Sequence, residues 1–75
     1  MEESEIIKSF GRVLKEIREE KGFTQERLAN ESESHFTHIS RLENGHKQPT
    51  LTTLFRLAEI LKVEPEDFIL RMKYK

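Results

Sequence analysis

The sequence predicts an all-α fold, a compact bundle of five short helices. Apolar residues recur at three- and four-residue spacing, no segment alternates polar and apolar residues as a strand does, and Gly, Thr or Pro separates the apolar stretches. The 75 residues leave room for one domain, residues 1–75, with a small core. We therefore expect a single domain whose stability would benefit from a second copy.

The first two helices are predicted from their apolar faces and their end signals. A helix from about residue 4 to residue 21 has an apolar face made of Ile6, Phe10, Val13, Leu14 and Ile17. Gly22 suits the left-handed position that ends it, and Phe23 can fold back onto its last turn. Thr24 then suits the N-cap of a second helix, about residues 25–31.

Three more helices follow. Ile39 and Leu42 indicate a third helix at about residues 35–43, closed by Asn44 and Gly45, and Thr50 caps a fourth that carries Leu51, Leu54, Leu57, Ala58 and Leu61. Pro65 begins a fifth, about residues 65–72. The expected core consists of Phe10, Leu14, Ile17, Leu28, Ala29, Ile39, Leu42, Leu54, Leu57, Ala58 and Leu61.

Composition excludes several classes of protein. There is no cysteine for a disulfide or a thiolate metal site, no apolar run of about 18 residues for a membrane span, and an acidic N-terminus where a signal peptide would be basic. We expect a cytoplasmic protein. Net charge is −1, but residues 1–33 carry six Lys/Arg against nine Glu, whereas residues 34–50 carry two against one and all three histidines. A polyanion would meet least repulsion there.

Three blocks of sequence resemble the Cro/CI-type, or XRE, family of helix-turn-helix regulators. They are Gly22-Phe23-Thr24-Gln25-Glu26-x-Leu28-Ala29, Ile39-Ser40-Arg41-Leu42-Glu43-Asn44-Gly45 and Pro49-Thr50-Leu51-x-x-Leu54. The resemblance spans roughly residues 10–68. It implies a bundle of about five helices in which the third enters the major groove of DNA while the second crosses the backbone.

The resemblance also implies roles for individual residues. The base-contacting residues would be His35, Phe36, Thr37, His38 and Arg41. Phosphate contacts would come from Gln25, Asn44, Lys47 and Thr50, the last through the start of its helix. Arg18 and Glu43 would form a buried structural ion pair. The turn between helices two and three departs from the family pattern, with Glu33 in place of Gly and Ser34 in place of an apolar residue. We expect positive φ at Glu33 and lost burial at Ser34 to weaken this turn.

Other interpretations stay open for several of these residues. Arg41 and Lys47 could be solvated surface charges, and Phe36 could belong to the core. The apolar face of the last helix, Phe68, Ile69 and Met72, could be ordinary core or a dimer interface; palindromic operators and small size favour the interface. His35 and His38 are three residues apart, but no matching carboxylate or thiol suggests a metal.

The sequence thus predicts a non-enzymatic, sequence-specific DNA-binding transcriptional regulator. It would bind a pseudo-palindromic operator as a homodimer, with no cofactor, metal, membrane partner or small-molecule ligand. Within the family, a controller protein of a restriction-modification system fits best, followed by a phage-type repressor or an antitoxin. The alternative from another class is a protein-interaction module, such as an antitoxin-like or adaptor bundle, which would show an apolar patch around Phe36.

Overall fold

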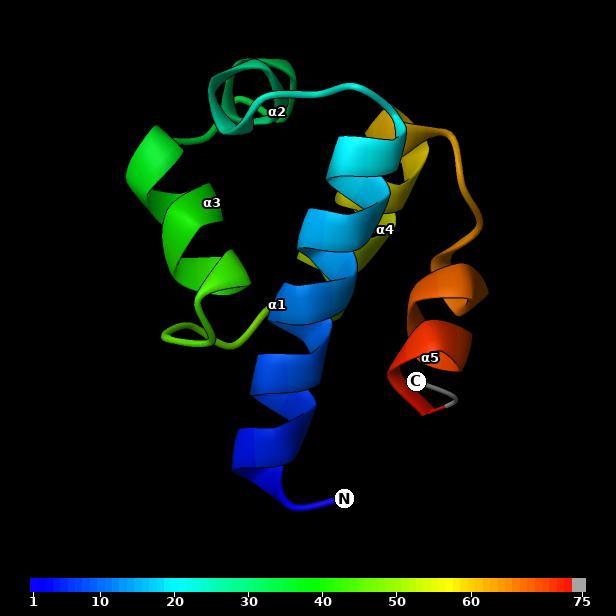
Figure 1. Ribbon diagram of the computed structural model, residues 1–75. Helices are drawn as coiled ribbons and strands as arrows, with labels where there is room; N and C mark the ends of the chain where they lie inside the picture. Colours follow the sequence, from blue (N-terminus) through cyan, green and yellow to red (C-terminus); the bar gives the residue numbers. More distant parts are fainter. Residues whose placement is uncertain (74–75) are drawn as a thin grey trace.

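The computed structural model describes residues 1–73 and contains five helices within them (Figure 1). They are α1 (Glu3–Glu20), α2 (Gln25–Glu31), α3 (Phe36–Glu43), α4 (Leu51–Leu61) and α5 (Pro65–Lys73). The all-α prediction is confirmed, and the helix ends differ from the expected ones by about one residue. His35 is the N-cap residue of α3 and not its first helical residue.

Helix α1 is the central element of the bundle. It packs against α3 on one side and against α5 on the other, while α2 contacts both α3 and α4 (Figure 1). Gly11 allows α3 to come close, because a Cβ at this position would overlap the carbonyl oxygens of Leu42 and Glu43. Any larger residue at position 11 would push the C-terminal end of α3 away from α1.

All of the expected core residues are buried, and Val13 and Phe68 join them. Phe68 is fully buried, and its ring stacks on that of Phe10 with 5.4 Å between the ring centroids. The prediction that Phe68 contributes to a dimer interface is therefore wrong: α5 folds back on α1 and buries this side chain inside its own chain. Ile69 remains exposed, and Met72 packs partly against the core.

The two threonine caps are confirmed. The Thr24 hydroxyl accepts a hydrogen bond from the Arg27 backbone N–H at 3.0 Å, and the Thr50 hydroxyl accepts one from that of Thr53 at 3.0 Å. Each cap pairs one of the backbone N–H groups that the first turn of a helix leaves without a partner. They fix the starts of α2 and α4.

Four helices end in the same way, with one residue at positive φ. These residues are Gly22, Glu33, Gly45 and Lys62. In each case the next residue's N–H donates back into the last turn, as Ser34 does to the Ala29 carbonyl at 2.9 Å and Val63 to that of Ala58 at 3.0 Å. The positive φ expected at Glu33 is confirmed at 54°, and Lys62 has the same backbone strain at 61°.

Ser34 lies half-buried beside a small crevice of about 30 Å³ between α3 and α4. Its hydroxyl is 2.9 Å from that of Ser32, which in turn donates to the Leu28 carbonyl at 2.7 Å. The serine thus forms a polar contact where an apolar side chain would fill the crevice.

Glycine should stabilise the two strained helix ends. We expect Glu33→Gly and Lys62→Gly each to raise the free energy of unfolding by about 0.5–1 kcal/mol, measured by urea denaturation, because glycine adopts positive φ without strain. Gly22→Ala is the control, since nothing lies within 4 Å of the added Cβ and only its φ of 76° opposes the change. It should destabilise, and a lower midpoint for both glycine variants would contradict the role assigned to backbone strain.

Candidate nucleic-acid interface

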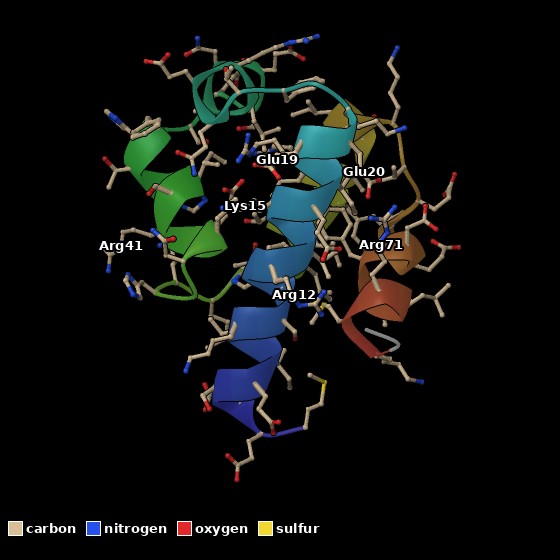
Figure 2. The ribbon with its side chains drawn as sticks, viewed as in Figure 1. Arg12, Lys15, Glu19, Glu20, Arg41 and Arg71 are labelled. Atoms are coloured by element: carbon tan, nitrogen blue, oxygen red, sulfur yellow. The ribbon has the colours of Figure 1, made fainter. Side chains whose placement is uncertain are left out.

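The outward face of α3 is the candidate interface. Ile39 and Leu42 point into the core, so residues on the opposite side of the helix point to solvent. Thr37 and Arg41 are exposed one turn apart, and Asn44 follows on the same side. Figure 2 shows Arg41 projecting from α3 away from the rest of the molecule.

Ser40 belongs to this face, and sequence reasoning missed it. It is half-buried and lies between Thr37 and Asn44 at spacings of three and four residues, and Asn44 Nδ2 donates to its hydroxyl at 3.4 Å. This spacing is readable in the sequence, because residues three and four apart share one side of a helix. The outward face of α3 therefore consists of Thr37, Ser40, Arg41 and Asn44.

The two residues at the start of α3 are both exposed. His35 is the N-cap residue, and its side chain makes no capping hydrogen bond. Phe36 is 49% exposed, so the interpretation of it as a core residue is wrong. A large aromatic side chain left in water beside the outward face is available for contact with another molecule.

His38 does not share the outward face. It is half-buried and lines the small crevice together with Ser34, Thr53 and Arg56. Burial, with a smaller contribution from the positive charge of Lys47, lowers the pKa of His38 below its ordinary value. The neutral ring is therefore favoured. Because His38 faces α4, its ring is less accessible to a DNA base than the Arg41 side chain is.

A buried network fixes the end of α3 against α1. Arg18 Nε donates to Glu43 Oε2 at 2.6 Å and Nη2 donates to Oε1 at 3.2 Å, while Nη1 donates to the Phe23 carbonyl at 2.8 Å. The two side chains are only 9% and 2% exposed. The expected ion pair is thus present in the structure, and both of its charges have hydrogen-bonding partners.

Gln25 joins this network from the first turn of α2. Its Nε2 donates to Glu43 Oε1 at 2.8 Å, which leaves the second amide hydrogen free to donate elsewhere. The predicted phosphate contacts Lys47 and Thr50 lie in the segment that follows the C-terminal end of α3, and the Thr50 hydroxyl is already engaged as a cap. What α4 offers there is the backbone N–H groups of its first turn.

The arginines differ in whether a carboxylate pairs with them. In the part of the chain that the structure describes, Arg12, Arg18, Arg27 and Arg71 form ion pairs with carboxylates, whereas Arg41 and Arg56 form none. Figure 2 shows Arg71 of α5 beside Glu20 of α1, the exposed pair that ties these two helices together. An unpaired guanidinium keeps all its donors for an external acceptor.

Within residues 1–73, no three His, Asp or Glu side chains cluster so that they could hold a metal ion, and no helix combines the length and the hydrophobicity that a membrane span requires. The fold and the exposed face together define a small helical domain that presents one helix on a rigid base, which is the architecture of a DNA-binding domain.

Comparison with known proteins leads to the same class. The family model described as helix-turn-helix matches residues 14–68. The chain is 38% identical over 69 residues to the HTH-type transcriptional repressor RghR of Bacillus subtilis; the match covers 91% of this chain and 51% of that protein, about half its length. It is 34% identical over 61 residues to the control protein C.BamHI of Bacillus amyloliquefaciens, covering 80% and 75%.

Comparison with a solved structure shows that the fold is similar as well. The restriction-modification controller protein C.AhdI from Aeromonas hydrophila superposes with a TM-score of 0.79 at 32% identity, covering 83% of this chain and 94% of that one. The chain belongs to the helix-turn-helix family of DNA-binding regulators. The predicted family membership is confirmed.

The buried ion pair should matter far more to stability than an exposed one. Glu43→Gln should lower the free energy of unfolding by about 3 kcal/mol or more in urea denaturation, because it leaves the Arg18 charge buried without a counter-charge. Glu31→Gln is the matched control: it breaks the exposed Arg27–Glu31 pair and should cost less than about 0.5 kcal/mol. Equal losses of unfolding free energy in the two variants would show that burial does not make the Arg18–Glu43 pair more important to stability than an exposed pair.

Proposed function

We propose that this protein is a sequence-specific transcriptional regulator that binds a pseudo-palindromic operator as a homodimer, with α3 in the major groove. The observation that carries the proposal is the outward face of α3, where Arg41 has no intramolecular partner. A helix with its side chains is about 10–12 Å across, and the major groove is about 12 Å wide. The controller and repressor proteins among its relatives support a role of that type.

Within this proposal, the residues have distinct tasks. Arg41 reads a guanine through O6 and N7, and Thr37 and Phe36 pack on a thymine methyl at the start of α3. Ser40 contributes a short hydroxyl at the centre of the face. Gln25, Asn44, Lys47 and the start of α4 hold phosphates on either side of the groove, and they position α3 without reading sequence.

A groove between α4 and the start of α5 supports the homodimer. Its volume is about 760 Å³, and its apolar lining includes Leu51, Phe55, Val63 and Pro65. Leu51 is 75% exposed and Phe55 58%, which is unusual for large apolar side chains in a small domain. Ile69 lies one turn after Pro65 on the same side of α5. We place the dimer interface on this α4/α5 groove and Ile69.

The rival protein-interaction function rests on the exposure of Phe36. The two functions differ in salt dependence. DNA binding through phosphates weakens steeply with salt, with a log–log slope near −0.9 for each phosphate neutralised, whereas apolar contact around Phe36 would not. Selecting duplexes from a randomised pool tests DNA binding, palindromic symmetry and half-site spacing together, and recovery of no sequence would reject the proposal.

Arg41→Ala should weaken binding to the selected operator by about 1–3 kcal/mol and relax base preference at one position of each half-site. The loss reflects a bidentate contact to guanine that alanine cannot make. Lys47→Ala is the control. Loss of a phosphate contact should weaken binding to the selected duplex and to a random duplex by the same factor, because phosphate contacts carry no sequence information. Affinities measured by fluorescence anisotropy on both duplexes check this. Equal losses on both duplexes for the Arg41 variant would remove its role in base reading.

Phe55→Asp should convert a dimer into a monomer in sedimentation experiments, because it places a charge in the centre of the α4/α5 groove. Affinity for a two-half-site operator should then fall roughly a hundredfold, since each half-site is bound independently. Leu70→Asp is the control, with a similar 50% exposure on α5 outside the groove. A dimer that tolerates the Phe55 variant but not the Leu70 variant would place the interface elsewhere.

A further inference from the structure

The α4/α5 groove carries charges as well as apolar side chains. Arg56 lies on its lining together with two carboxylates, Glu59 of α4 and Glu64 of the loop before α5. None of these three side chains forms an ion pair or hydrogen bond within the described part of the chain. The unpaired charges differ from those on α1 and α5, where Arg12 and Arg71 both have carboxylate partners.

Closing this groove would remove water from the three charges. Leu51 and Phe55 lie beside them, and an ion beside apolar surface loses hydration when that surface is covered. The partner best matched to the groove would therefore supply a carboxylate to Arg56 and a cation to Glu59 and Glu64. A purely apolar partner would supply no counter-charge to any of the three.

A second copy of this chain satisfies both requirements. In a two-fold symmetric dimer the same surface faces itself, so any pairing between residues i and j occurs twice. We infer that Arg56 of each copy pairs with the groove carboxylates, Glu59 and Glu64, of the other copy, and that this pairing determines which chains can dimerise. The inference rests on the homodimer of the proposed function, and it adds what makes a copy of this chain the preferred partner.

The pairing would act on partner choice more than on overall affinity. An ion pair that loses its water in an interface adds little net affinity where the cost of desolvation offsets the attraction, but like charges brought together there are strongly unfavourable. A related chain with a carboxylate at position 56, or a cation at position 59 or 64, would thus be excluded from mixed dimers with this one.

Charge reversal in two separate chains tests the inference. Arg56→Glu makes the charges of the groove all acidic, and Glu59→Arg or Glu64→Arg makes them more basic. Each variant alone should dimerise about tenfold or more weakly than the unmodified full-length chain in sedimentation experiments, because like charges then face each other. An equal mixture of the acidic variant with a basic one should form mixed dimers well above the half expected from random pairing, measured by native mass spectrometry.

The matched control uses charges away from the groove. Lys15→Glu and Glu3→Arg reverse exposed charges on α1 that form no ion pair, and they produce the same changes in net charge. Their mixture should form mixed dimers at the random proportion of half. If the α1 mixture is enriched as strongly as the groove mixture, overall charge attraction explains the result and the inference is wrong.

The outcomes separate this inference from the proposed function. Enrichment of mixed dimers between Arg56→Glu and either Glu59→Arg or Glu64→Arg supports the pairing. The basic variant that gives the enrichment identifies the carboxylate that pairs with Arg56. If the unmodified chain dimerises and binds its operator but neither groove mixture is enriched, the pairing is rejected and the proposed function stands. If the unmodified chain is monomeric even at high concentration, the homodimer fails and the pairing fails with it.

Discussion

The contact between α1 and the end of α3 is the constraint on which the rest of the structure depends. Gly11 lets the two backbones approach, and the Arg18–Glu43 pair joins them where they meet. Gln25 connects α2 to the same carboxylate. Three helices are thereby held through one buried anion, so the outward face of α3 has a fixed orientation relative to the start of α2. A surface that reads DNA needs such rigidity, because base contacts tolerate little displacement.

Most of the fold could be predicted because helical spacing and burial are directly related. Residues such as Leu28, Ile39 and Leu57 lie on stripes that can only face inward, and Thr24 and Thr50 are strong N-cap signals. Phe68 was assigned to a dimer interface because helical spacing identifies an apolar face of a helix but not whether that face is covered by the same chain or by a second copy. Knowing that α5 returns to α1, where Phe10 receives the ring, requires the tertiary structure.

The candidate site was predicted less completely, for local geometric reasons. His38 was grouped with its sequence neighbours, yet it flanks the core face of α3 and lines the crevice toward α4. Ser40 was readable from its spacing to Thr37 and Asn44. The exposed Leu51 and Phe55 belong to the most apolar helix of the chain, where a second apolar side is hard to tell from a wide core stripe. Lys62 at positive φ carries no sequence signal, unlike Gly22 or Gly45.

The stacking of Phe68 on Phe10 has a consequence for how such a regulator could respond to its own abundance. Since Phe68 packs α5 onto α1 within one chain, separation of the two copies of the proposed dimer would expose the groove without opening the core. Association would then be a reversible equilibrium between folded molecules, without exchange of helices. The number of assembled pairs would rise with the square of the amount of free chain at low levels, giving a sharper onset of operator occupancy than a single folded unit could achieve.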